Sequence, residues 1–409
     1  MSTHAISDLY QMQSLPLKHK ITMTEQRIRG FYDHYEGDVY LSFSGGKDST
    51  VLADIIDKMD YKDIPLVYFD TGLEYPEVRE FVKTYGDRVD WVKPKKNFKD
   101  IITKYGYPFI SKEVADVLEY SKKYLKKIYA KGMVTCESAN PRLSEIYESA
   151  KKQGVHLITR TQIINGEFIH KEKGVVTDET SKRYDYSKYK FLLEAPFDIS
   201  SQCCAYMKKE PAKRYHKETG RNPITAQMAS ESRLRTQMWL KHGCNAFDLK
   251  TPMSSPMMFW TEQDVLTYLR INNIPIAPVY GDIIPDPQGV EGQMSFADLG
   301  LFEREQPLLC TTGCDRTGCS MCGFGYHIEK RPSRFEVMEK LSSPQLLDYM
   351  LRGGGFENGR WIPSNDGLGY WFVLKWMNVH GNMDMFIPYY EKYEEKYGNE
   401  LTKMYLGGN

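Results

Sequence analysis

The chain has no excess charge of either sign, no long hydrophobic run and no internal repeat. Its 54 basic residues balance its 54 acidic residues, so attraction to nucleic acid would have to come from local patches. Residues 1–20 contain no continuous apolar segment of the kind found in signal peptides, and no later stretch approaches the length that spans a bilayer. We therefore expect a cytoplasmic protein with no membrane partner.

The sequence is also poor in cysteine for a protein held together by disulfides. Eight cysteines in a long chain that we expect to lie in a reducing compartment favour metal or redox chemistry instead. Two stand alone, Cys136 and Cys244, and we expect them to be ordinary buried thiols. The other six form an adjacent pair and a cluster of four, namely Cys203 with Cys204, and Cys310, Cys314, Cys319 and Cys322.

Strand and helix patterns alternate in the first hundred residues or so. Residues 39–43 are β-branched and aromatic, and apolar residues at helical spacing follow from 51 to 59. Residues 66–69 repeat the strand pattern before a second helical pattern, and "RVDWVKP" indicates a third strand. Such alternation implies right-handed crossovers between parallel strands. We predict an α/β fold, with a parallel twisted sheet covered by helices on both faces.

The composition predicts three regions. We expect an N-terminal helical segment at residues 1–36, the α/β domain at 37–300, and a cysteine-rich and helical C-terminal region at 301–409. Within the domain, an insert at about 111–190 is helical and rich in lysine and tyrosine, and its Asn165-Gly166 turn suggests a β-hairpin. The lysines favour a solvated helix face, and the alternative is a contact surface for nucleic acid.

Two polar, glycine-containing segments follow the first two predicted strands, at residues 44–49 and 70–72. In parallel α/β sheets ligands bind beyond the carboxyl ends of the strands, where both segments fall. Glycines let the backbone approach a ligand and direct N–H groups at it, and the following helix adds its positive end. The spacing fits neither the Walker nor the dinucleotide-binding motif. We therefore predict a phosphate-binding loop of another kind.

The stretch "SGGKDS" resembles the pyrophosphate loop (PP-loop) of the ATP pyrophosphatase superfamily, which is adenine nucleotide alpha hydrolase-like. Its members split ATP between the α and β phosphates and transfer AMP. "FDTGLEYPE" is similar to the second motif of the phosphoadenosine phosphosulfate (PAPS) reductase branch, and "CCAYMKKEP", "ASESRLR" and "FWTEQDVLTYLRINNIPIAPVY" add to the likeness. The resemblance covers most of residues 39–330. The later stretch "RTGCSMCGFGYHIEKRPSRFEVM" resembles that of PAPS reductase domain proteins associated with phages and bacteria.

The resemblance implies which residues bind the nucleotide. The loop would cradle the β and γ phosphates through Ser44, Gly45, Gly46, Lys47, Asp48 and Ser49. Asp70 and Gly72 would lie near the nucleotide, with Asp70 helping to hold Mg²⁺. We expect Lys47 and Asp48 to be catalytic.

A second set would complete the phosphate or sulfate end of the site, namely Glu231, Arg233 and Arg235, with Arg235 catalytic. A guanidinium fork suits planar oxyanions, although a surface ion pair is as good an interpretation of any single one of them. Trp260, Asp264 and Tyr268 carry the family likeness, but we assign them mainly to packing and helix capping.

The resemblance also implies an iron–sulfur site. In adenylylsulfate reductases that are similar to this chain, a Cys-Cys pair and a later Cys-x-x-Cys hold a 4Fe-4S cluster, and the matching residues here are Cys203, Cys204, Cys319 and Cys322. Four thiolates suit Zn²⁺ as well, and the compact set from Cys310 to Cys322 has zinc-like spacing. A zinc site therefore remains the alternative.

Two departures from the reductases decide which reaction we expect. Reductases that resemble this chain attack sulfur with a cysteine near the carboxyl terminus, but no cysteine follows Cys322 here. They also commonly lack the loop lysine, whereas Lys47 is present as in the ATP-splitting members. We therefore predict an ATP pyrophosphatase that uses ATP and Mg²⁺ to adenylate a substrate. Its context would be sulfur transfer, with a sulfur donor protein and DNA or tRNA as substrate.

Two alternative functions follow from the same residues. A PAPS or adenylylsulfate reductase would use a partner's thiol to release sulfite from a sulfonucleotide. A nucleotide- and metal-sensing regulatory module would bind nucleic acid without turnover, and the lysine-rich insert favours it.

Overall fold

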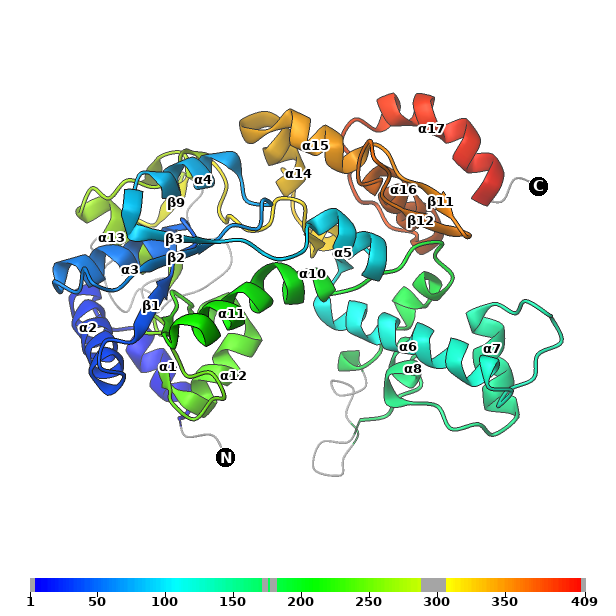
Figure 1. The fold of residues 1–409 in the computed structure, drawn as a ribbon, viewed down its shortest axis with the longest axis horizontal. Helices are drawn as coiled ribbons and strands as arrows, with labels where there is room; N and C mark the ends of the chain where they lie inside the picture. Colours follow the sequence, from blue (N-terminus) through cyan, green and yellow to red (C-terminus); the bar gives the residue numbers. More distant parts are fainter. Residues whose placement is uncertain (1–3, 171–175, 177–181, 288–306, 406–409) are drawn as a thin grey trace. The chain divides into compact units, whose positions relative to one another are not determined.

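The computed structural model describes residues 4–170, 176, 182–287 and 307–405 (Figure 1). The chain forms two compact units: unit 1 contains residues 1–95 and 208–320, and unit 2 contains residues 96–207 and 321–409. The boundaries therefore differ from those expected from composition. The insert extends beyond 111–190, and the chain from residue 321 clusters with it instead of forming a region of its own.

Unit 1 is built on a six-stranded sheet in the order β3-β2-β1-β5-β7-β6. Its strands are β1 (Val39–Ser42), β2 (Leu66–Phe69), β3 (Val89–Val92), β5 (Asn222–Ile224), β6 (Asn245–Ala246) and β7 (Met253–Ser254). All neighbours pair in parallel except β6 and β7, which are antiparallel. The predicted α/β fold with a parallel sheet is confirmed, with β6 as an antiparallel strand that was not predicted, and all three strands expected near the amino end are present.

Helices cover both faces of this sheet. The principal helices are α3 (Lys47–Lys58), α4 (Pro76–Lys83), α11 (Glu210–Thr219), α12 (Arg233–His242) and α13 (Glu262–Ile271). Tyr40 and Val67 form a core cluster with Tyr215 of α11 on one face of the strands. The crossover helices α3 and α4 lie on the other side (Figure 1), as right-handed connections require.

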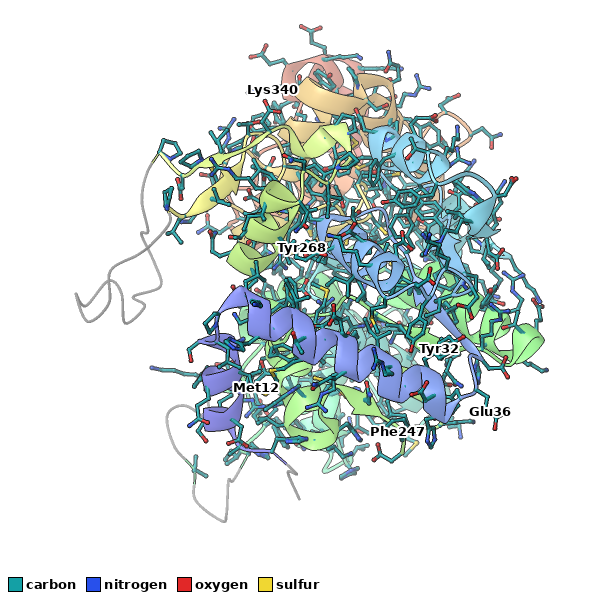
Figure 2. All side chains as sticks on the ribbon, turned by 90° about the vertical axis from the view of Figure 1, so that its left-hand side faces the viewer. Met12, Tyr32, Glu36, Phe247, Tyr268 and Lys340 are labelled. Carbon is teal, nitrogen blue, oxygen red and sulfur yellow. The ribbon has the colours of Figure 1, made fainter. Side chains whose placement is uncertain are left out.

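Two N-terminal helices, α1 (Ile6–Gln13) and α2 (Leu17–His34), belong to the same unit. Tyr32, labelled in Figure 2 near the end of α2, stacks on Tyr61 with ring centroids 4.4 Å apart. Thr24 is fully buried, and its hydroxyl accepts a hydrogen bond from Trp260 Nε1 at 2.9 Å. The remaining elements are η1 (Gly86–Arg88), η4 (Ala229–Glu231), η5 (Pro278–Tyr280) and the antiparallel pair β8 (Ile283–Pro285) and β9 (Leu309–Thr311).

Unit 2 is mainly helical. Its helices are α5 (Phe98–Tyr105), α6 (Lys112–Ala130), α7 (Leu143–Lys152), α8 (Thr159–Ile164), α10 (Gln202–Cys204), α14 (Arg334–Val337), α15 (Pro344–Leu351), α16 (Tyr370–Gly381) and α17 (Tyr390–Tyr405). Shorter helical turns are η2 (Ser187–Leu193), η3 (Ala205–Lys209), η6 (Tyr326–Ile328) and η7 (Met338–Ser342). Strand β4 (Phe109–Ile110) pairs in parallel with β10 (Gly323–Phe324), and β11 (Gly355–Glu357) pairs with β12 (Arg360–Ile362). Among the described helices, none is both long and apolar enough to cross a membrane.

The hairpin predicted at Asn165-Gly166 is wrong, because the residues before this turn form helix α8. Ile163 and Ile164 are buried, and α8 contacts α6. Asn165 caps the end of the helix, and Gly166 follows it with φ +71°. The turn signal was therefore correct, but it ends a helix instead of joining two strands.

Candidate nucleotide site

The loop between β1 and α3 is tied together by its two serines. Ser49 Oγ donates to the Gly46 carbonyl at 3.0 Å and lies 3.1 Å from Ser44 Oγ. Gly45 has φ +69°, and a Cβ there would lie 2.6 Å from Val82 Cγ2 of α4. The close packing of this loop against α4 therefore requires glycine at position 45.

Lys47 is the first residue of α3 and is almost fully buried. Its Nζ lies 3.0 Å from Glu262 Oε1, at the start of α13, and 5.2 Å from the centre of the Tyr280 ring. The Tyr280 hydroxyl accepts from the Lys47 backbone N–H at 3.4 Å and lies 2.5 Å from Thr317 Oγ1. The lysine ammonium is thus held at the positive end of a twelve-residue helix, a position suited to phosphate.

Asp48 lies among charges of both signs. Burial raises the pKa of its carboxyl to about 6, and the Glu262 carboxylate acts in the same direction. Lys47, Arg316 and Arg235 oppose this shift and lower the pKa. The structure therefore brings together all three residues predicted to be catalytic, Lys47, Asp48 and Arg235, together with Arg316.

Glu231 connects the two arginines of this cluster. It forms an ion pair with Arg235, one helical turn away, and its other oxygen lies 3.8 Å from Arg316 Nη1. The carboxylate also accepts from the Met228 backbone N–H at 2.9 Å. Glu231 therefore serves two guanidinium groups. Burial and the nearby Arg316 lower the pKa of Arg235. Arg233 is exposed and makes no ion pair with the described part of the chain.

The second polar segment follows β2. Asp70 is buried, and its two oxygens accept from Arg79 Nη2 at 2.9 Å and from the Gly72 N–H at 3.3 Å. Gly72 has φ +71°, which favours glycine at this turn. Both Asp70 oxygens are thus engaged within the protein. The predicted nearness of Asp70 and Gly72 to a nucleotide remains a prediction.

A cavity of about 320 Å³ lies beside the loop, at the carboxyl ends of β1 and β2. Ser44 lines it from the loop, Tyr68 from β2, Lys208 from η3 and Gln227 from the segment after β5. The Tyr68 hydroxyl is buried and has no hydrogen-bond partner among the described residues. Buried hydroxyls normally have a partner, so this hydroxyl is an exception within the described part of the chain. The volume falls within the range of small-molecule sites.

The four predicted cluster ligands are divided between the two units. Cys203 and Cys204 lie on α10 with their sulfurs 4.0 Å apart and belong to unit 2 with Cys322, whereas Cys319 belongs to unit 1. Across the described ranges, no group of three or more His, Cys, Asp or Glu side chains is close enough together to hold a metal ion. The iron–sulfur, Zn²⁺ and Mg²⁺ sites therefore remain predictions.

The other four cysteines differ in how far they are buried. Burial raises the pKa of Cys314 to about 11 and also raises the pKa of Cys310. Cys244 is buried, as predicted, and burial raises its pKa, whereas Cys136 is only partly buried.

The contacts of Trp260, Asp264 and Tyr268 agree with their assignment to packing and helix capping. The Trp260 indole N–H donates to Thr24 of α2, and Asp264 completes the capping box of α13 by accepting from the Thr261 backbone N–H at 2.7 Å. Tyr268, labelled in Figure 2, donates to Asp54 at 2.7 Å. Four residues near the loop were not predicted from the sequence, namely Glu262, Tyr280, Arg316 and Thr317. Glu262 and Tyr280 lie inside the quoted "FWTEQDVLTYLRINNIPIAPVY" stretch, and the other two open "RTGCSMCG", so the signal was a motif whose polar members had no assigned role.

A family comparison covers most of unit 1. The model of the phosphoadenosine phosphosulfate reductase domain family matches residues 38–132 and 159–323. The match includes the loop from Ser44 to Ser49, the Glu231 to Arg235 segment and all four predicted cluster cysteines.

Individual relatives match shorter parts. Two uncharacterised proteins of Methanocaldococcus jannaschii are 34% identical over 109 residues and 30% identical over 137 residues, which are 24% and 32% of this chain. These matches are 26% and 28% of the relatives' own length, so the chain spans about a quarter of the curated relatives it matches. The crystal structure of PAPS reductase from Candida auris in complex with phosphate aligns with 14% identity and a TM-score of 0.32, covering 68% of this chain and 98% of that one.

Proposed function

The chain belongs to the phosphoadenosine phosphosulfate reductase domain family of PP-loop, nucleotide-utilising enzymes, and from this we propose that it is an ATP pyrophosphatase. It would split ATP into AMP and pyrophosphate and adenylate an oxygen of its substrate, as a step in sulfur transfer or in sulfur modification of a nucleic acid. The observation that carries the proposal is the position of Lys47, which is buried at the start of α3 behind a glycine loop.

In this reaction the acceptor oxygen forms a bond to the α phosphorus. The bond from that phosphorus to the bridging oxygen breaks, and pyrophosphate leaves with the electron pair. The loop N–H groups and Lys47 would stabilise the charge that develops on the leaving pyrophosphate. ATP would bring Mg²⁺, which neutralises phosphate charge when bound. The Lys47 Nζ lies 3.0 Å from Glu262 Oε1, so a bound phosphate would compete with Glu262 for the ammonium.

Three further groups have proposed roles. The guanidinium groups of Arg235 and Arg316 share Glu231, which leaves positive charge for an oxyanion. Asp48, with a pKa of about 6, is largely ionised at neutral pH and would take the proton that the acceptor loses. The Tyr68 hydroxyl, buried without a partner among the described residues, would bond the nucleotide in the adjacent cavity.

The test compares ATP and PAPS as substrates of the wild type, of Lys47→Ala and of Lys58→Ala. Lys58 ends the same helix and pairs with Asp54, so it controls for loss of a lysine from α3. Loss of a donor aimed at developing charge typically lowers kcat by about 10²–10³, so we expect that loss of pyrophosphate release for Lys47→Ala and nearly unchanged activity for Lys58→Ala.

Wild-type turnover in Lys47→Ala would refute the assignment. Sulfite released from PAPS in the presence of a thiol, with ATP inert, would make the protein a sulfonucleotide reductase instead. Binding of nucleic acid with no turnover of either nucleotide would favour a regulatory module.

A further inference from the structure

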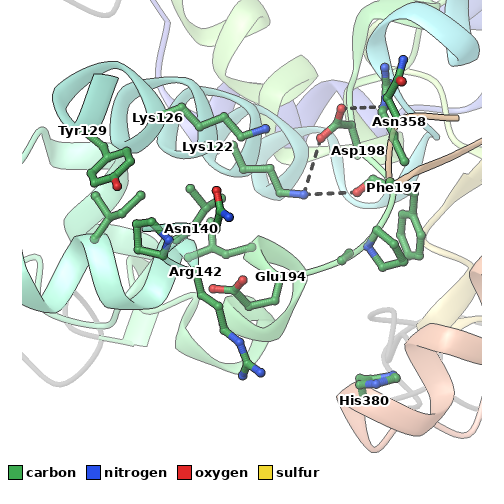
Figure 3. Close-up of a pocket in the computed structure, with 18 of the residues that line it drawn as sticks. Lys122, Lys126, Tyr129, Asn140, Arg142, Glu194, Phe197, Asp198, Asn358 and His380 are labelled. Atoms are coloured by element: carbon green, nitrogen blue, oxygen red, sulfur yellow. Dashed lines mark hydrogen bonds and ion pairs between the residues drawn. The ribbon is translucent and has the colours of Figure 1, made fainter. Parts of the chain in front are cut away.

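A second cavity lies within unit 2, and all its lining residues belong to that unit (Figure 3). Its volume is about 970 Å³, at the upper end of the range for small-molecule sites. Its walls come from α6, the start of α7 with the segment before it, the end of η2 with residues 194–198, the turn between β11 and β12 with the start of β12, and α16. None of its residues belongs to the nucleotide site described above.

One carboxylate in this cavity serves two cations. Asp198 Oδ2 lies 2.9 Å from Arg360 Nε, and its Oδ1 lies 3.5 Å from Lys122 Nζ. Lys122 is buried on the inner side of α6 and also donates to the Phe197 carbonyl at 3.1 Å. These interactions appear as dashed lines in Figure 3. A buried lysine and an arginine thus share a single negative charge.

Two further cations line the same cavity. Lys126, one helical turn after Lys122, and Arg142, just before α7, are exposed and make no ion pair with the described part of the chain. The charge of Lys126 lowers the pKa of Lys122, although burial is the larger cause. Glu194, the other acidic residue of the cavity wall, accepts from the Ser144 backbone N–H at 2.8 Å. Four cations therefore face two carboxylates, and the cavity carries net positive charge.

Aromatic side chains also line the cavity. His380 is exposed at the end of α16, and its ring stacks on Trp376 with centroids 4.2 Å apart and planes 13° apart. Tyr129 lines the cavity from α6. Positive groups that track a phosphate backbone, next to rings on which bases stack, are the chemistry of single-strand nucleic-acid sites.

We propose that this cavity binds a single-stranded segment of nucleic acid, with its phosphodiester groups on Lys126, Arg142 and the Lys122–Arg360 pair. The inference rests on the proposed function, because a nucleic acid is one of its acceptor substrates. A strand suits the site better than a free nucleotide, since its cations are spread over a cavity about three times the volume of the one beside the PP-loop. DNA and RNA share the phosphodiester chemistry, and the experiment distinguishes them.

The test is fluorescence anisotropy with labelled single strands of DNA and of RNA, about 12 nucleotides long, at several salt concentrations and without ATP. The cavity variant combines Lys126→Glu and Arg142→Glu. Its matched control combines Lys127→Glu and Lys152→Glu, which make the same charge change on α6 and α7 at exposed residues outside the cavity. Circular dichroism confirms that both variants fold, and the neutral pair Lys126→Gln with Arg142→Gln provides a milder change.

We expect the cavity variant to lose at least about tenfold in affinity for one of the two strands, with a salt slope reduced by about two. The control should stay within about threefold of the wild type. Equal losses in both variants, wild-type affinity in the cavity variant, or binding of free AMP or ATP there with no binding of either strand would overturn the proposal. Because the assay needs no turnover, Lys47→Ala should bind the strand normally, so a failure of the proposed function is separable from a failure of this one.

Discussion

Substitution of Gly45 by alanine tests the packing of the phosphate loop, because two separate effects oppose a side chain there. The residue has φ +69°, and an L-residue in this conformation costs about 1–2 kcal/mol. An added Cβ would also lie 2.6 Å from Val82 Cγ2 and 3.0 Å from Val78 Cγ1. Overpacking of this kind costs about 1–3 kcal/mol. We therefore expect Gly45→Ala to lower the free energy of unfolding of unit 1 by about 2–5 kcal/mol.

Gly72→Ala is the matched control, since Gly72 ends the loop after the neighbouring strand. Its φ is +71°, but nothing lies within 4 Å of an added Cβ. Only the backbone effect of about 1–2 kcal/mol should remain in that variant. The difference between the two variants therefore measures the contact with α4.

Hydrogen exchange of peptides from α3, measured by mass spectrometry over a urea titration, reports the stability of this loop. The double variant Gly45→Ala with Val82→Ala should cost less than the sum of its single variants, by about 1 kcal/mol or more, because Val82→Ala removes the closest atom. Equal costs for Gly45→Ala and Gly72→Ala, together with additivity in this cycle, would refute the reasoning.

Three other outcomes are expected. The pKa of Asp48 is about 6 in the folded protein against 3.8 ordinarily, so its contribution to stability falls as pH rises from about 4 to 6. Without nucleotide, Asp48→Asn should therefore raise the free energy of unfolding above pH 6 by at most about 3 kcal/mol, and should not raise it below about pH 4. Urea titrations that show a difference independent of pH would contradict this. Glu262→Gln should raise ATP affinity up to about fivefold in calorimetry, because its solvent-screened pair with Lys47 is worth at most about 1 kcal/mol, and lower affinity would count against competition for the lysine. Protein purified without oxygen should contain iron and acid-labile sulfide, which the Cys203→Ser variant should lose and the Cys136→Ser variant should keep. Zinc without iron would favour the alternative metal, and protein without any metal would contradict both predictions.

The sequence alone predicts the features of this protein that depend on neighbours in the chain. The alternation of strand and helix near the amino end follows from periodicities of two and 3.6 residues, and β1, α3, β2, α4 and β3 all form as expected. The glycines, lysine and serines of the phosphate loop are contiguous, so their chemistry is visible before folding. Even there, local signals can mislead: the Asn165-Gly166 turn ends helix α8, in which Ile163 and Ile164 are buried and which contacts α6.

Tertiary structure alone decided which distant charges meet. Glu262 pairs with Lys47 across 215 residues of sequence. Arg316 pairs with Glu231, which precedes it in the same segment of unit 1. In unit 2, Arg360 and Lys122 share Asp198, although all three residues are far apart in the sequence. Motifs specify the residues that one loop presents, but a pairwise contact between remote side chains depends on the packing of every element between them. The charge balance of both sites therefore became visible only in the folded chain.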